Sequence, residues 1–213
     1  MTSTILSGRR LAIMLLLYAK GASGKQNEPV EGRTRLTKML FLLDKEYDAF
    51  HQAAKLKFEA YAFGPYDSGI YDDLAFLENM GWLRGSAASD KSDLTFGDVI
   101  DEKVKDDSFA YLDASELDEA DLSYEYLMGG VAETVPERYE TRKYVLSEEG
   151  ITVVKNALRT AQNDPNLPKL MDAIQEVKTR YNGLSLRDLL RSVYKKYPES
   201  ATDSTILTQL RVG

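Results

Sequence analysis

Hydrophobic residues recur at the three- and four-residue spacing of amphipathic helices along much of this chain. The spacing predicts helices over about 34–47, 67–80, 148–162, 168–181 and 185–197. An apolar run, Leu11–Ala19, precedes them and predicts a first helix that is buried in the core. Short alternating stretches near 58–63 and 144–146 predict strands. The chain is therefore expected to be mainly α with a small β component.

The stretch Phe58–Leu83 contains the clearest succession of local signals. Pro65 fixes its own φ and keeps Gly64 out of the helical region, so an extended segment should turn there. Asp67 or Ser68 can cap the helix that follows, and Gly81 is suited to end it. The pattern predicts a strand, a turn, a helix and a second strand.

Two motifs in this chain resemble those of the winged-helix domain. The first is the L-x-x-L-E-x-x-G-W-L pattern of Leu74–Leu83, and the second is the Y-x-L-S-x-x-G step of Tyr144–Gly150. The resemblance implies that the first motif is the recognition helix and that the second is the far side of the wing. It covers residues 9–84 and 140–160, and we expect it to reach Ser185–Ser204.

A narrower resemblance rests on Gly32–Asp44 and on the F-x-A-Y-x-x-G-P-Y segment of Phe58–Tyr66. Both are similar to YwgA-like prokaryotic proteins and, more distantly, to antitoxins of the SocA or Panacea type. This resemblance implies a protein-binding regulatory or adaptor module of antitoxin type. It also implies a toxin–antitoxin or phage-defence setting.

Charge divides the chain unevenly. The total is −7, but Gly85–Glu140 has 16 acidic and 4 basic residues, a net of −12, which leaves the rest at +5. We therefore predict a winged-helix-like domain over 1–84 and 140–163, an acidic insertion over 85–139 in the wing position, and a helical C-terminal extension over 164–213. The insertion also carries aromatic residues, so it is either a docking surface for a basic partner, an imitation of nucleic-acid charge, or an acidic surface that aids solubility.

Composition argues against several kinds of chemistry. The chain has no cysteine, which fits a reducing cytoplasm, and its one histidine, His51, makes a histidine metal site improbable. Gln26 follows Gly24-Lys25 where a phosphate-binding loop needs Ser or Thr. We predict no enzyme activity, no cofactor and no metal site.

The apolar run near the N-terminus allows two interpretations. Arg9-Arg10 before it is reminiscent of a signal peptide, but Lys20-Gly21-Ala22 is a poor cleavage site and the run is too short to span a bilayer. A buried helix is the favoured interpretation, so we expect no membrane partner and a cytoplasmic location.

A surface for a protein partner, one that could be basic, is predicted around the central turn. The predicted recognition helix carries carboxylates and no Lys or Arg, whereas a DNA-reading helix needs cations near phosphates. Tyrosine side chains offer large contact area at low entropic cost. The residues predicted to bind a partner are Lys38, Tyr61, Phe63, Pro65, Tyr66 and Tyr71.

Two alternatives stay open beside this prediction. The aromatic residues could simply hold the strand, turn and helix together. The chain could also be a winged-helix DNA-binding regulator that contacts phosphates through Arg33, Arg35 and Lys38, although nucleic acid is not the favoured partner. A homodimer is likewise left open.

Overall fold

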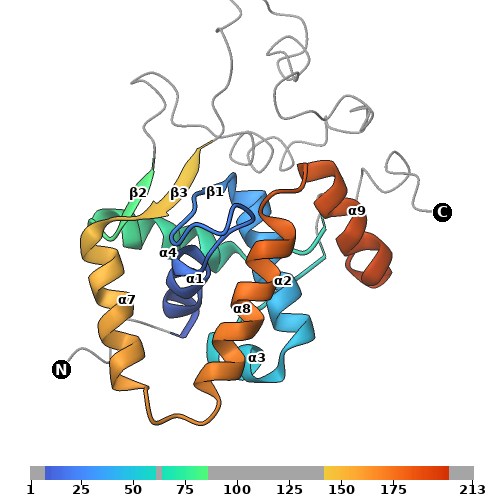
Figure 1. Ribbon diagram of the computed structural model, residues 1–213. Helices are drawn as coiled ribbons and strands as arrows, with labels where there is room; N and C mark the ends of the chain where they lie inside the picture. The colour runs from blue at the N-terminus through green and yellow to red at the C-terminus, as the bar shows by residue number, and fades with distance from the viewer. Residues whose placement is uncertain (1–7, 61–63, 86–141, 202–213) are drawn as a thin grey trace, which may run out of the picture.

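A computed structural model of the chain describes residues 8–60, 64–85 and 142–201 (Figure 1). Over these residues the protein is mainly helical with a small antiparallel sheet, which confirms the expected fold class at that level. The acidic insertion predicted over 85–139 lies outside the described residues except for Gly85, and so do Tyr61, Phe63 and the end of the C-terminal extension.

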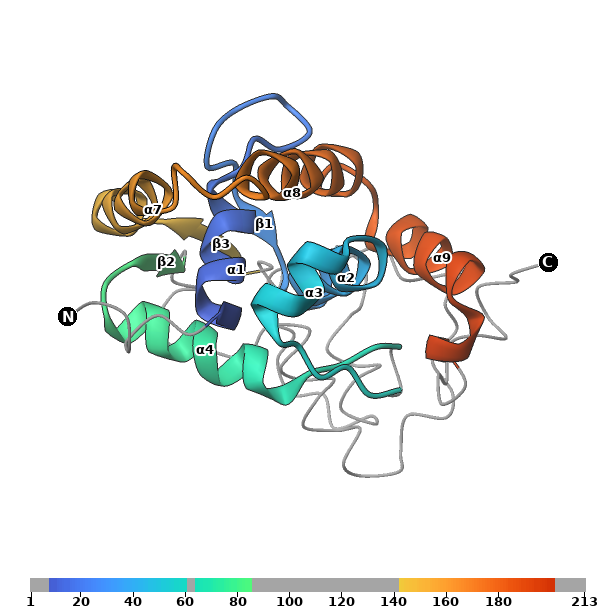
Figure 2. The same cartoon turned by 90° about the horizontal axis from the view of Figure 1, so that it is seen from below.

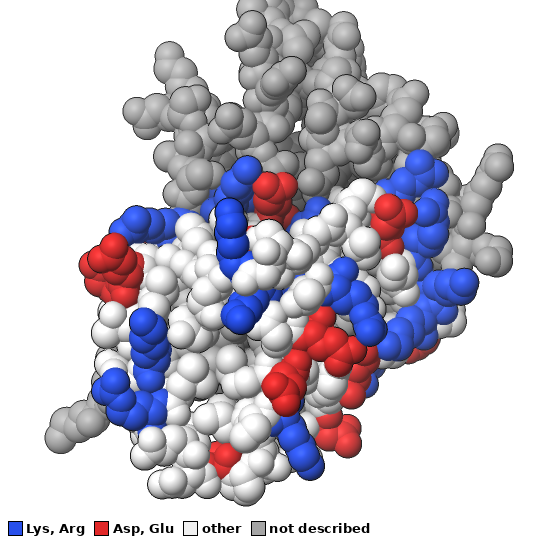
Figure 3. Space-filling view, in the orientation of Figure 1, with Lys and Arg blue, Asp and Glu red and all other residues white. Residues whose placement is uncertain are grey.

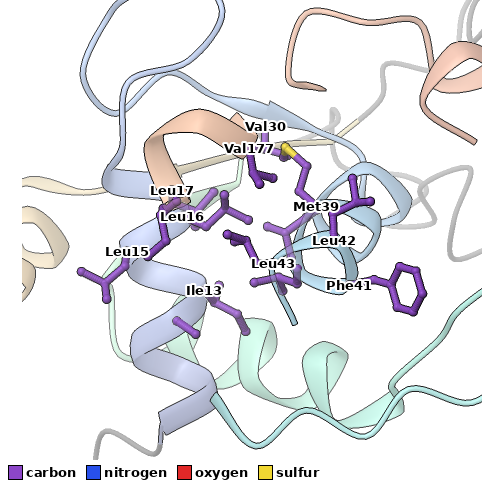
Figure 4. Packing of buried hydrophobic residues seen from close by; sticks show 14 of the residues in the cluster. Ile13, Leu15, Leu16, Leu17, Val30, Met39, Phe41, Leu42, Leu43 and Val177 are labelled. Atoms are coloured by element: carbon purple, nitrogen blue, oxygen red, sulfur yellow. The ribbon is translucent and has the colours of Figure 1, made fainter. Parts of the chain in front are cut away.

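Helix α1 (Gly8–Tyr18) is the central helix of the core. Its side chains Ala12–Leu17 are all buried, because α1 packs against α2 (Arg33–Glu46), α3 (Asp48–Ala54), α4 (Ser68–Asn79) and the later helices on several sides. Figure 4 shows Ile13, Leu16 and Leu17 of α1 meeting Met39 and Leu43 of α2. The apolar run is therefore a core helix, as expected. No described helix is both long and apolar enough to cross a membrane.

Three short strands form the sheet, in the order β1-β3-β2. Strand β3 (Lys143–Leu146) pairs antiparallel with β1 (Val30–Glu31) on one side and with β2 (Leu83–Gly85) on the other. Ser147 then caps α7 (Glu148–Thr160) by accepting a hydrogen bond from the Gly150 amide, so the predicted strand-to-helix step is confirmed.

Only residues 58–60 of the extended segment predicted near 58–63 are described. Glu59 and Tyr66 form one isolated antiparallel bridge, with two backbone hydrogen bonds of 2.9 Å. Positions 61–63 lie outside the described residues. Asp67 is the cap of α4, since its carboxylate accepts a hydrogen bond from the Gly69 amide at 2.9 Å.

The C-terminal helices belong to the same hydrophobic core as α1. Helix α8 (Leu167–Tyr181) packs against α1 and α2, and α9 (Leu186–Lys196) packs against α2 before a short 3₁₀ turn, η2 (Pro198–Ala201). Seen from below, α9 lies on the side of α2 that is farther from α1 (Figure 2). Residues 164–201 thus complete the core and do not stand apart from it.

Candidate partner-binding surface

The turn at Gly64-Pro65 is built against the C-terminal helix α9. Gly64 has a φ of 79°, and a Cβ at this position would lie 2.5 Å from the ring of Tyr194. Tyr194 is itself almost fully buried. Both the positive φ and the close approach require glycine here, so the sequence G-P matches a backbone that must both turn and touch an aromatic ring.

Pro65 and Lys38 lie in the interior of this turn. Pro65 is buried, and Lys38 is 3% exposed. The Lys38 ammonium donates a hydrogen bond of 2.9 Å to the Pro65 carbonyl and so joins α2 to the turn. Lys38 was expected to lie near Pro65, and it does, but neither side chain is placed to meet a partner.

Arg35 is also an internal residue. It is 4% exposed, and its guanidinium donates to the backbone carbonyls of Tyr181 at 3.3 Å and Leu184 at 2.5 Å. A buried guanidinium needs such acceptors because leaving its N–H groups unmatched would be costly. The prediction that Arg35 and Lys38 contact phosphates is therefore wrong, because both side chains are buried and donate to backbone carbonyls inside the protein.

Three of the predicted residues do form a common surface feature, which we call the Arg33–Tyr71–Tyr66 cluster. The Arg33 guanidinium carbon lies 4.3 Å from the centre of the Tyr71 ring, and the rings of Tyr71 and Tyr66 are 5.2 Å apart. All three side chains are half-buried. The cluster thus brings Arg33, which was predicted to contact nucleic acid, next to two tyrosines that were predicted to bind a protein partner.

The carboxylates of α4 face mostly inward or toward cations, which corrects the expected acidic surface. Asp73 is 1% exposed and is contacted by the Nε atoms of Arg9 at 2.5 Å and Arg10 at 2.6 Å. Glu78 forms an ion pair of 2.8 Å with Arg142. Asp67 is the buried cap of the helix. Of the four carboxylates at positions 67, 72, 73 and 78, only that of Asp72 is therefore exposed.

The outward face of α4 is consequently small and nearly neutral. Its exposed residues before the last turn recur at helical spacing and are Ser68, Asp72 and Ala75, followed by Asn79. None is a cation. Across the face drawn in Figure 3, Lys and Arg side chains are mixed with carboxylates and gather most clearly on the side of α9.

Sequence reasoning missed the partners of these groups. Arg9 and Arg10 were considered only as the start of a leader sequence, although they hold the buried carboxylate of α4. Tyr194 falls within the predicted helix over 185–197, but nothing in the sequence indicates its contact with Gly64. The pairs are separated by 63 or more residues along the chain, and no local pattern connects them.

A further buried cation, Lys178 of α8, was also missed. Its ammonium donates to the carbonyls of Leu17 at 2.6 Å and Ala19 at 2.9 Å, at the C-terminal end of α1. The side chain is fully buried, and this burial lowers the pKa of Lys178 to about 7, against a smaller opposite effect of Glu28. Lys178 is thus a structural cap for α1.

The surface gives no sign of metal chemistry where it is described: no group of three or more His, Asp or Glu side chains there could hold an ion. No protein-family model matches this chain, and no curated protein matches it either. The resemblances to winged-helix proteins and antitoxins therefore stay predictions.

Proposed function

We propose that the chain is a winged-helix protein in which α4 stands in the place of the recognition helix and β2 and β3 are the two sides of the wing. In support, α4 leads directly into β2, and β2 pairs with β3 across residues 86–142. The acidic insertion then begins where the tip of a wing would lie.

The proposed activity is the capture of a protein partner, as in a regulatory or adaptor module of antitoxin type. The single observation that carries it is the outward face of α4, which offers no cation and adjoins the Arg33–Tyr71–Tyr66 cluster. Tyrosine and arginine are the residue types that most often dominate the affinity of protein interfaces. Duplex DNA, in contrast, is bound chiefly through cations.

The partner would be masked or recruited by contacts with this cluster, and the net charge of −12 over Gly85–Glu140 favours a basic partner. The toxin–antitoxin or phage-defence setting rests on the antitoxin resemblance. The proposed surface is smaller than the one predicted from the sequence, because Pro65 and Lys38 are internal.

The decisive experiment compares the double variant Tyr66→Ala, Tyr71→Ala with the wild type in affinity capture from the source organism, with protein and nucleic acid both assayed. A partner that is identified is then purified and titrated by calorimetry. We expect the double variant to bind at least about tenfold more weakly. Tyr47→Ala is the matched control, because Tyr47 is a half-buried tyrosine at the other end of α2.

The thermal melt of each variant shows whether the loss is specific. A double variant that melts near the wild type and loses the partner supports the proposal, whereas one that binds the partner with unchanged affinity refutes it. Recovery of DNA alone, lost steeply as salt increases, would instead support the DNA-binding alternative. Of the cations named for that alternative, only Arg33 is half-exposed.

A further inference from the structure

A cavity of about 370 Å³, open to solvent on one side, lies between α1, α3, α7 and α8, and none of its lining residues belongs to the partner-binding surface. Leu11 and Leu15 of α1, Ala53 of α3, Ala157 and Leu158 of α7, and Leu170 of α8 are among its walls. Figure 4 shows Leu15 pointing from α1 on the side opposite to α2. Its volume falls within the range of small-molecule sites in proteins.

The cavity exists because α7 is only partly packed. Of its thirteen residues, only Gly150 and Val154 are buried, and neither lies beyond its midpoint. In the second half, Ala157 and Leu158 are half-buried and line the cavity, as does Ala161 just beyond. Alanines at Ala49, Ala53, Ala157 and Ala161 leave space that larger side chains would fill.

Nine of the twelve lining residues are Leu or Ala, and three are polar. The polar lining residues are Gln52, Asp164 and Asn166, which are all exposed, and Asp164 is the only charged residue among those that line the cavity. One oxygen of Asp164 accepts a hydrogen bond of 2.9 Å from the Asn166 amide, and that contact restrains the carboxylate, which is exposed and belongs to the lining of the cavity.

We propose that this cavity binds an amphipathic small molecule with an apolar body and a cationic or hydrogen-bond-donating head. An enclosed apolar cavity of about 150 Å³ suffices for benzene. This cavity is open to solvent but larger, and its volume leaves room for a medium-length alkyl chain or two rings. The Asp164 carboxylate attracts a cation and repels an anionic head. The site is independent of the proposed partner surface.

The test uses three probes with the same ten-carbon chain, decylamine, 1-decanol and decanoate, each below its micelle concentration. Their affinities for the full chain are measured by calorimetry at pH 7.5. We expect decylamine to bind at least tenfold more tightly than decanoate, with 1-decanol between them. Asp164→Asn should remove the preference for the amine and leave the affinity for 1-decanol unchanged.

Two variants that fill the space, Ala157→Phe and Ala53→Leu, separate binding in the cavity from binding to the acidic surface. Either variant should abolish binding of all three probes, and Ala75→Leu, an exposed position on α4, should not. Two such variants are used so that the test can still be made if one of them fails to fold. The proposal is overturned if no probe binds, if decanoate binds as tightly as decylamine, or if a folded filled variant binds as the wild type does.

Discussion

The buried charged side chains are the residues whose roles depend most on their partners. Lys38, Lys178 and Arg35 each direct their N–H groups at backbone carbonyls, while Asp73 accepts from two arginines. Apart from a further hydrogen bond from Arg35 to the Glu31 carbonyl, each partner belongs to a segment distant in sequence. The three cations stabilise the fold by donating hydrogen bonds to backbone carbonyls that would otherwise be buried without a partner. The two arginines do the same for the buried carboxylate of Asp73.

Lys178 makes the stability of the protein depend on pH in a defined direction. Burial lowers its folded pKa to about 7, whereas the unfolded chain keeps the ordinary value near 10.5. Between these values the unfolded state binds more protons, so the free energy of unfolding should increase as pH rises from 7 to 9. Urea unfolding at several pH values measures this slope.

The variant Lys178→Met is the control for that slope. It cannot titrate, so its free energy of unfolding should change less between pH 7 and 9 than that of the wild type. The range ends at pH 9 because burial raises the pKa of Tyr144 to about 12, and this group acts with the opposite sign above pH 10. Equal slopes in the two proteins would contradict the prediction.

The contact between the Gly64-Pro65 turn and α9 links two elements that the sequence keeps far apart. Tyr194 fills the space that a side chain at position 64 would need, and Lys38 fixes the same turn from α2. The ring centres of Phe58 and Tyr197 lie 5.2 and 5.3 Å from that of Phe41 on α2, in edge-to-face arrangements. The conformation of the turn therefore depends on α9 being in place.

Gly64→Ala should destabilise the protein strongly. The new Cβ would meet the Tyr194 ring in addition to the strain of a positive φ, and we expect a loss of about 2–4 kcal/mol in the free energy of unfolding. Gly24→Ala is the matched control, since Gly24 has a φ of 76° and no atom within 4 Å of its added Cβ. That control should lose only about 1 kcal/mol.

Chemical denaturation of both variants measures the difference. If Gly64→Ala is no less stable than Gly24→Ala, the close approach of Tyr194 to position 64 does not contribute to the free energy of unfolding.

At the scale of the whole molecule, one hydrophobic core joins the N-terminal helices, the sheet and the C-terminal helices. Ile174 and Val177 of α8 are buried together with Leu16 of α1 and Val30 of β1. Helix α8 also supplies the cap for α1 and a backbone carbonyl that accepts a hydrogen bond from Arg35. Without α8, residues 8–163 would therefore have an incomplete hydrophobic core.

A chain ended after residue 163 should consequently fail to unfold cooperatively. Its exposed core would leave a compact state without fixed packing, which near-ultraviolet circular dichroism and a urea titration can detect. Adding residues 164–213 as a separate chain should restore the transition at least in part. A cooperative, stable fragment of residues 1–163 would contradict this prediction.

Local patterns determined most of the secondary structure. The spacing of apolar residues placed the helices near their observed bounds, since a helix must bury one face wherever it packs. Asp67, Gly81 and Ser147 marked helix ends because capping chemistry is local. The total absence of cysteine and the asymmetry of charge are likewise properties of the sequence alone.

Tertiary structure alone decided which charged and aromatic side chains are accessible. The sequence indicates that α4 is acidic, but not that Asp73 points inward to Arg9 and Arg10. Nor does it indicate that Arg35 and Lys38 are buried and donate hydrogen bonds to backbone carbonyls. Burial and pairing depend on contacts across 27 to 149 residues, which periodicity cannot report. The sequence therefore determined most of the elements, although not β1 or α3, and only the packing of the elements decided which residues remain to meet a partner.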